Sequence, residues 1–240
     1  MKTLLLSIAA SLPLVMAAAL APAAETPLPA LDKATTAIVI TDPQNDFLSE
    51  NGLLYGLVSE NLAELGTIDN IEILMKTAKS TGVALAVDPL VYTKVDIERS
   101  GAGALQRQLL DMRALYRESM NSTEGFAGSG ADFYEPYKKY IHDGDTIVVA
   151  PHKMYGPESN DLIYQLRARG IETVILGGLV ANLCVDSHMR ALMENGFKVY
   201  VVKDAVGAPG QDAYNAALVN YSMIANGVVT TKDVTQILSH

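Results

Sequence analysis

The chain has 240 residues, of which 49% are hydrophobic, so it can bury the core of one large or two small domains and is not disordered in composition. Its formal net charge of -9 at pH 7 argues against a nucleic-acid partner, because the phosphate backbone attracts basic surfaces. The single cysteine, Cys184, excludes an internal disulfide and a cysteine-rich zinc site.

Residues 1–23 have the pattern of a secretory signal peptide, because a short basic start is followed by an apolar run over 4–20 and then by small residues. The pattern predicts cleavage near residue 23 and export, to a bacterial periplasm, with no stable membrane association afterwards. An uncleaved membrane anchor is the alternative interpretation. A linker is expected over 24–34 and one folded domain over 35–240. Finding only the uncleaved precursor, in the cytosol, would contradict the prediction of export.

Beyond residue 35, short apolar runs alternate with longer helical patterns. Strands are predicted over 37–40, 83–87, 146–149, 173–176, 198–202 and 228–230, and helices over 58–79, 161–169, 185–194 and 213–225. The strands are continuously apolar, which indicates a parallel sheet buried on both faces. We therefore predict a three-layer α/β/α, Rossmann-like doubly wound domain with about six mainly parallel strands and no second domain. The segment 92–140 is irregular, as is typical of a lid or an oligomer contact.

Three reactive side chains follow predicted strands, at the edge where parallel sheets bind ligands. Asp42 follows the first strand, Lys153 the third and Cys184 the fourth. Cys184 also begins a predicted helix, whose exposed N–H groups and dipole are expected to lower the pKa of its thiol. We expect the Lys153 ammonium to act in the same direction, and Asp42 to accept the thiol proton.

Each of these residues has an ordinary interpretation when it is considered alone. A lone cysteine is most often a small buried hydrophobic residue, an aspartate before proline is a turn residue, and a lysine is a solvated surface charge. Their joint placement is what favours a catalytic site. His188, four residues after Cys184, leaves a Cys/His dyad open, although a packed or solvated helix residue is commoner at that spacing.

Two motifs carry a resemblance to a known family. Asp-Pro-Gln-Asn-Asp-Phe over 42–47 and Gly-Leu-Val-Ala-Asn-Leu-Cys-Val over 178–185 resemble the opening and nucleophile motifs of the isochorismatase-like cysteine hydrolases, which include nicotinamidases and N-carbamoylsarcosine amidohydrolases. Lys153 has the spacing of the family's lysine, and Asp204-Ala205 matches its usual Asp-Ala pair. The resemblance extends over residues 35–232.

The resemblance implies an Asp42–Lys153–Cys184 triad that hydrolyses a C–N bond of a small amide, carbamoyl compound or ureide. Cys184 would form a thioester, Asp42 would act as general acid and base, and Lys153 would give electrostatic support. It also implies a cis peptide bond between Leu179 and Val180, and an oxyanion hole made by the backbone N–H groups of Val180 and Cys184. The candidate substrate contacts are Phe47, Gln44, Tyr155 and Asn182.

The chain also departs from the family's patterns. No histidine occurs before residue 142, so the metal site of the nicotinamidases is not expected, and we predict no metal and no cofactor. Ala181 replaces a threonine that is frequent in the family, and residues 154–157 also differ from its usual sequence. The alternatives are an isochorismatase-type vinyl-ether hydrolase and a non-catalytic binding protein of the same fold. The resemblance further implies a small-molecule substrate and a homo-oligomer, either a dimer or a tetramer.

Overall fold

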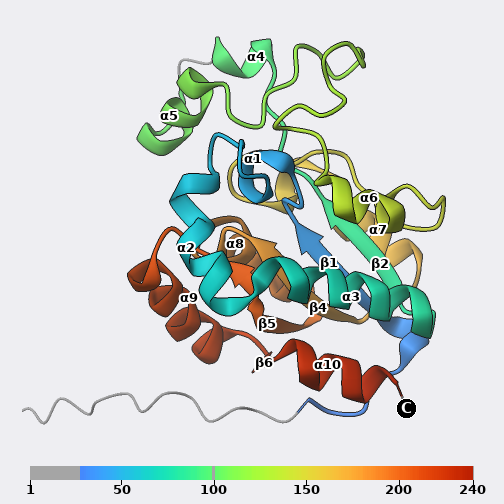
Figure 1. The fold of residues 1–240 in the computed structure, drawn as a ribbon. Coiled ribbons are helices and arrows are strands. Elements are labelled where there is room, and N and C mark those ends of the chain that lie inside the picture. Colours follow the sequence, from blue (N-terminus) through green and yellow to red (C-terminus); the bar gives the residue numbers. More distant parts are fainter. Residues whose placement is uncertain (1–27, 99–100, 240) are drawn as a thin grey trace, which may run out of the picture.

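The computed structural model describes residues 28–98 and 101–239 (Figure 1). The predicted signal peptide and the start of the predicted linker lie outside these residues, so export remains a prediction, as does the homo-oligomer. Within the described ranges no helix has both the length and the apolar character that a bilayer crossing requires.

The centre of the fold is one six-stranded parallel sheet with the strand order β3-β2-β1-β4-β5-β6. The strands are β1 (Thr36–Thr41), β2 (Ala84–Asp88), β3 (Ile147–Val148), β4 (Thr173–Leu179), β5 (Lys198–Gly207) and β6 (Gly227–Val229). The order reverses direction at β1 and β4, which lie side by side at the middle of the sheet. This is the doubly wound arrangement that the sequence predicted.

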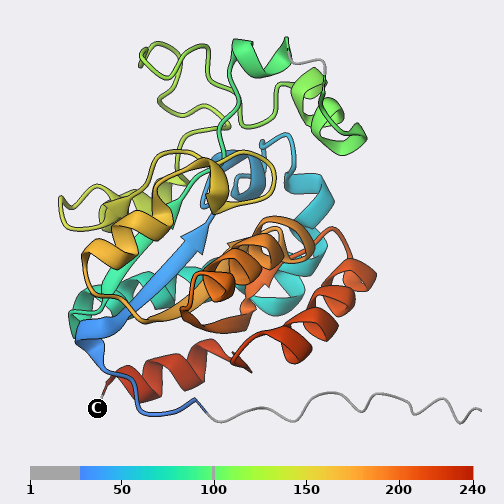
Figure 2. The same cartoon turned by 180° about the vertical axis from the view of Figure 1, so that it is seen from behind.

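Helices cover both faces of the sheet and complete three layers (Figures 1 and 2). The helices are α1 (Asn45–Leu48), α2 (Tyr55–Leu65), α3 (Thr67–Thr81), α4 (Lys94–Ile97), α5 (Ala104–Met112), α6 (Lys138–Ile141), α7 (Leu162–Ala168), α8 (Asp186–Glu194), α9 (Gln211–Ile224) and α10 (Thr231–Leu238). Helices α2, α3 and α10 pack on one face, and α7, α8 and α9 pack on the other.

Strand β1 shows why the sequence has continuous apolar runs. Ile38 and Ile40 join the hydrophobic cluster under α3, whereas Ala37 and Val39 join the cluster under α7 and α8. Because successive side chains of a strand point to opposite faces, a sheet that is covered on both faces needs apolar residues at every position.

The structure also corrects several predicted element boundaries. The helix predicted over 58–79 is two helices, because Gly66 takes a left-handed conformation (φ 65°) that ends α2. Helix α10 was not predicted, although Thr230 and Asp233 form a capping box at its start. Asp204 lies within β5 rather than after it, and its carboxylate accepts two hydrogen bonds from Thr231. The segment 92–140 contains α4, α5 and the start of α6, and α4 and α5 lie beyond the carboxyl ends of the strands (Figure 1).

Gly178 allows β1 and β4 to approach each other closely, directly beside Asp42. A Cβ atom at Gly178, which has φ +115°, would lie 2.2 Å from the backbone oxygen and 2.5 Å from the backbone nitrogen of Thr41. Neither backbone atom can move without disturbing the paired strands. We expect Gly178→Ala to lower the free energy of unfolding by about 3 kcal/mol or more, measured by denaturant titration.

Gly56→Ala is the matched control for this substitution. Gly56 lies inside α2, and a Cβ atom there meets no atom within 4 Å. Because alanine favours the helix over glycine, this variant is expected to be as stable as the wild type or up to about 1 kcal/mol more stable. Equal stability of the two variants would contradict the close approach at Gly178.

Candidate active site

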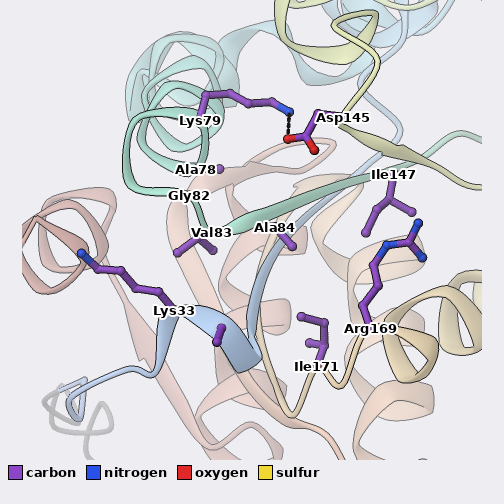
Figure 3. Close-up of a pocket in the computed structure, with 11 residues that line it drawn as sticks. Lys33, Ala78, Lys79, Gly82, Val83, Ala84, Asp145, Ile147, Arg169 and Ile171 are labelled. Atoms are coloured by element: carbon purple, nitrogen blue, oxygen red, sulfur yellow. Dashed lines mark hydrogen bonds and ion pairs between the residues drawn. The ribbon is translucent and has the colours of Figure 1, made fainter.

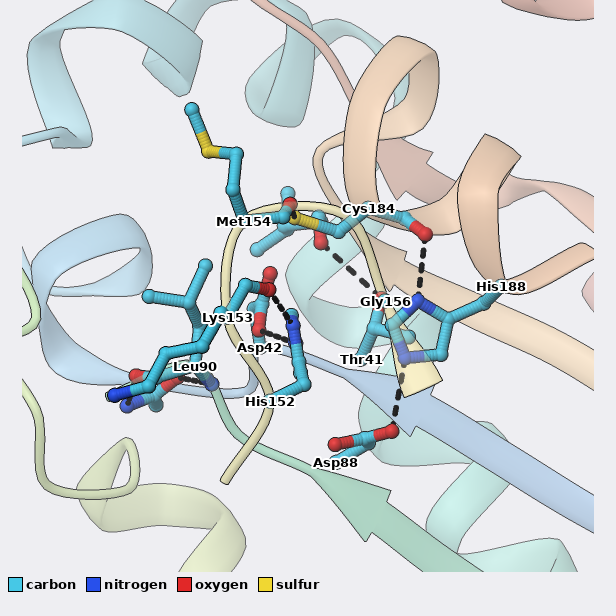
Figure 4. A network of polar contacts seen from close by, with 12 residues as sticks. Thr41, Asp42, Asp88, Leu90, His152, Lys153, Met154, Gly156, Cys184 and His188 are labelled. Carbon is cyan, nitrogen blue, oxygen red and sulfur yellow. Dashed lines mark hydrogen bonds and ion pairs between the residues drawn. The ribbon is translucent and has the colours of Figure 1, made fainter. Parts of the chain in front are cut away.

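The candidate site lies at the carboxyl ends of the central strands, where three loops meet (Figure 4). Asp42 follows β1, Cys184 lies in a π-helical turn (Ala181–Val185) that links β4 to α8, and His152 lies in the loop after β3. A carboxylate oxygen of Asp42, a ring nitrogen of His152 and Cys184 Sγ all lie within 4.8 Å of one another. The structure therefore brings Asp42 and Cys184 together, with a histidine as the third group.

A pocket of about 260 Å³ opens at the other end of the sheet (Figure 3). It lies at the first residues of β2 and β3, and its basic lining residues are Lys33, Lys79 and Arg169. Lys79 also pairs there with Asp145, at 3.4 Å. Since its lining contains no thiol and no imidazole, this pocket does not offer the nucleophilic chemistry of the opposite edge.

Asp42 is fully buried, and its two carboxylate oxygens differ in their partners. Oδ1 lies 2.8 Å from Nε2 of His152, whereas Oδ2 has no hydrogen-bond partner among the described residues. The backbone of Asp42 is left-handed (φ 51°), and its N–H donates to the carbonyl of Asp88 at 2.9 Å. Buried carboxylate oxygens are normally hydrogen-bonded, so Oδ2 is available to accept a proton from a neighbouring group.

Cys184 is a buried thiol close to the carboxylate of Asp42. Only 3% of the residue is exposed, and Sγ donates a hydrogen bond of 3.4 Å to the carbonyl of Met154. Burial, together with the Asp42 carboxylate, raises the pKa of Cys184 well above its usual value, and a hydrogen bond from the Val180 N–H only partly offsets this. The position of Cys184 at a helix start predicted a lowered pKa of the thiol, which is wrong for this site without substrate. The neutral thiol needs a base in order to react.

The backbone beside the thiol has the form that the family resemblance implies. The peptide bond between Leu179 and Val180 is cis, and the Val180 N–H is directed at Cys184 Sγ. A backbone donor that points at the sulfur also lies close to where a carbonyl oxygen would come to rest during attack. The oxyanion hole at Val180 and Cys184 remains a prediction.

Lys153 does not join Asp42 and Cys184, contrary to the prediction from spacing. Its Nζ donates to Asp96 Oδ2 at 2.7 Å and to the carbonyl of Val91 at 2.8 Å. A third of the side chain is exposed, whereas the neighbouring His152 is fully buried. Adjacent residues in an extended loop direct their side chains to opposite sides, so only one of the two can face Asp42.

A second buried histidine supports the turn that carries the thiol. His188 Nδ1 donates to the carbonyl of Cys184 at 2.6 Å, and its Nε2 lies 2.8 Å from Asp88 Oδ2. Asn160 donates to the other oxygen of Asp88 at 2.6 Å. His188 thus contacts the backbone of Cys184 and not its sulfur, so the Cys/His dyad interpretation is wrong.

Sequence reasoning missed the roles of His152 and of the Asp88–His188 pair. The available signal was the position of these residues: Asp88 ends β2, His152 follows β3, and His188 lies one helical turn after Cys184. Both histidines are fully buried, and their rings meet edge to face with centroids 4.8 Å apart.

Two of the four candidate substrate contacts are buried in the protein, and the other two are partly or largely exposed. Gln44 is not available to a ligand, because its amide donates to the carbonyls of Leu90 and Ala131 and accepts from the Leu90 N–H. Phe47 is 5% exposed and belongs to the hydrophobic cluster that also contains Cys184. Asn182 is only partly buried, and its Oδ1 is a buried atom with no partner among the described residues. Tyr155 is 56% exposed, at the outer edge of the loop that carries His152.

Comparison with known proteins identifies the family of the chain. The model of the isochorismatase domain matches residues 36–233, which is most of the chain. The chain belongs to the isochorismatase family. It is 26% identical over 212 residues to the ureidoacrylate amidohydrolase RutB of Variovorax paradoxus (strain S110), with 88% of this chain and 84% of the relative covered.

Solved structures share the fold of this isochorismatase-family chain. A cysteine hydrolase from Pseudomonas syringae pv. phaseolicola 1448A superposes with a TM-score of 0.70 at 19% identity, covering 88% of this chain and 95% of that one. The nicotinamidase/pyrazinamidase PncA of Bacillus subtilis superposes with a TM-score of 0.62 at 21% identity, covering 81% and 99%.

Two groups of buried side chains have spacings that a metal ion could use. One is Asp42, His152 and Cys184, and the other is Asp88, His152 and His188. Both ring nitrogens of His152 and both of His188 already lie within hydrogen-bond distance of oxygen atoms of the protein, so a cation would have to displace these contacts. These residues fit a hydrogen-bonded network better than a resident metal, and the expected absence of a metal remains a prediction.

Proposed function

We propose that this isochorismatase-family chain is an amidohydrolase that cleaves a C–N bond of a small molecule through a thioester on Cys184. The observation that carries the proposal is the unpartnered Asp42 Oδ2 beside a buried, neutral thiol. A thiol of raised pKa is a weak nucleophile until a base removes its proton, and a carboxylate oxygen without another partner is suited to that task.

The first half of the reaction begins when Cys184 Sγ attacks the carbonyl carbon as its proton passes to Asp42 Oδ2. The C–N bond then breaks, and the protonated Asp42 returns the proton to the leaving nitrogen as the thioester forms. In the second half, Asp42 takes a proton from water, the water oxygen attacks the thioester, and the proton returns to Sγ. The products are a carboxylic or carbamic acid and an amine or ammonia.

The surrounding residues provide binding for such a substrate. The backbone N–H groups of Val180 and Cys184 would donate to the oxyanion, which would lower the activation barrier by about 3 kcal/mol. Asn182 Oδ1 has no partner among the described residues and is suited to accept a hydrogen bond from a substrate N–H. Phe47 would contribute apolar contact, and Tyr155 would lie at the entrance.

The names of the relatives support C–N hydrolysis in particular. The curated relatives include ureidoacrylate amidohydrolases from several bacteria, and the structural neighbours include nicotinamidases. An amide carbonyl gives the thiol a carbon to attack, whereas a vinyl ether needs no nucleophile of this kind. We therefore favour ureides, carbamoyl amines and primary carboxamides over isochorismate.

The test is a substrate panel with one member of each class: a ureide, a carbamoyl amine, a primary carboxamide and isochorismate. Release of ammonia or amine from at least one C–N substrate is expected, and added hydroxylamine should divert the thioester to a hydroxamate. Turnover of isochorismate alone would favour the vinyl-ether alternative. No turnover of any member would favour a binding protein.

A further inference from the structure

The ring of His152 is held between two acceptors in the buried part of the site. Nε2 lies 2.8 Å from Asp42 Oδ1, and Nδ1 contacts the backbone carbonyl of Lys153. A carbonyl oxygen can only accept, so Nδ1 carries a hydrogen, and an ionised Asp42 requires a hydrogen on Nε2 as well. With Asp42 ionised, both ring nitrogens of His152 face acceptors, and the ring is then a doubly protonated imidazolium.

The charges around His152 favour this protonated form. Burial alone lowers the pKa of His152, but the charge of Asp42, its hydrogen bond and the charge of Asp88 outweigh burial and raise the pKa to about 9. The other titratable groups that face the ring are the thiol of Cys184 and the ring of His188, which is itself bonded to Asp88. The cation is present below this pKa and is lost as the pH rises through it.

The ammonium group of the neighbouring residue, Lys153, is paired with a carboxylate in a different part of the site. The Lys153 ammonium binds Asp96, whose carboxylate also accepts from the backbone N–H and the hydroxyl of Thr93 at the start of α4. This pairing ties the loop after β3 to the segment around α4, which lies beyond the strand ends (Figure 1). In Figure 4 the Lys153 side chain extends away from Cys184.

We propose that His152, as an imidazolium, is the positioning residue that keeps Asp42 ionised with Oδ2 free for the thiol proton, and that Lys153 instead holds the α4 segment. This inference rests on the proposed function and replaces the lysine that the family resemblance implied. The site thereby contains a cation that titrates at moderately alkaline pH. A lysine in the same place would keep its charge to higher pH, because the ordinary pKa of lysine is about 10.4.

The kinetic test compares three variants across the pH range. His152→Gln keeps a donor for Asp42 but no charge, and its kcat/KM is expected to fall about 100-fold or more. In the wild type, kcat/KM should decline above the His152 pKa of about 9. His152→Lys should restore activity to within about tenfold of the wild type and move that decline to higher pH, since the ammonium retains its proton longer.

Lys153→Met is the matched control, because it removes the neighbouring ammonium and keeps an unbranched side chain. It is expected to lose less than about tenfold in kcat/KM and to keep the wild-type alkaline decline. If Lys153→Met loses activity while His152→Gln keeps the kcat/KM of the wild type, the assignment is overturned and the role returns to Lys153.

A readout that needs no turnover separates this inference from the proposed function. Nitrogen-15 chemical shifts of the four histidines report the protonation of each ring, and the His152 signals are those absent from the His152→Gln and His152→Lys variants. We expect a doubly protonated His152 at about pH 7 that loses this state in Asp42→Asn. A neutral ring there would overturn the inference even in an active enzyme. A charged ring in a chain that hydrolyses no amide would support the inference and contradict the proposed function.

Discussion

The Cys184→Ala variant is expected to lose at least about three orders of magnitude in kcat on any amide that the wild type hydrolyses. The reason is that Sγ forms the covalent bond to the carbonyl carbon in the proposed mechanism, and the described residues place no other thiol near Asp42. Steady-state kinetics on the best substrate of the panel measures the loss. Hydroxamate formation should disappear in the same variant.

Two controls keep this result interpretable. Because the alanine removes one buried sulfur atom, the variant should still unfold cooperatively, which thermal unfolding checks. Cys184→Ser retains a donor for the carbonyl of Met154 but replaces the thiol by a weaker nucleophile, so it should bind substrate and remain nearly inactive. Full turnover by either variant would exclude the thioester and favour a reaction that does not use Cys184.

The Asp42→Asn variant is expected to lose activity on a similar scale, about three orders of magnitude, because an amide cannot accept the thiol proton. Asparagine adopts left-handed backbone conformations readily, so the φ of 51° at this position should be preserved. The loss would therefore report the missing carboxylate and not a displaced loop. Asp145→Asn, which removes a carboxylate that is 91% exposed, should leave kcat unchanged.

The same substitution should change the thiol in the opposite direction. Burial and the Asp42 carboxylate both raise the pKa of Cys184, and Asp42→Asn removes the second cause while keeping the first. The pKa of the thiol should consequently fall towards its usual value, which the carbon-13 shift of the single cysteine can follow against pH. An unchanged or higher pKa, or an active Asp42→Asn enzyme, would contradict the role of Asp42 as base.

Much of the fold could be predicted because its signals are local. The apolar run at 37–40 needs no knowledge of its neighbours to be identified as a doubly covered strand, and Gly82 and Gly196 end helices through their own backbone preferences. One error occurred where a helix ends inside a continuous helical pattern, because Gly66 ends α2 within the helix predicted over 58–79. Another occurred in 92–140, which was interpreted as irregular although α4 and α5 lie within it.

The site could also be predicted in part from local signals. Asp42 and Cys184 follow strands that pair in parallel, and parallel strands end at one edge of a sheet, so their approach follows from sequence order and strand pairing alone. Gln44 was misassigned because its side-chain amide bonds the backbone at Leu90 and Ala131, which are distant in sequence.

By itself the sequence determined the parallel sheet, the edge that carries the reactive groups, and two of the side chains found there. Only the tertiary structure decided that His152 rather than Lys153 faces Asp42, because the path of the loop after β3 fixes the direction of each side chain. It also decided that the pKa of Cys184 is raised rather than lowered. A helix start favours the thiolate from local geometry, but burial among segments distant in sequence opposes any buried charge, and here burial is the larger effect.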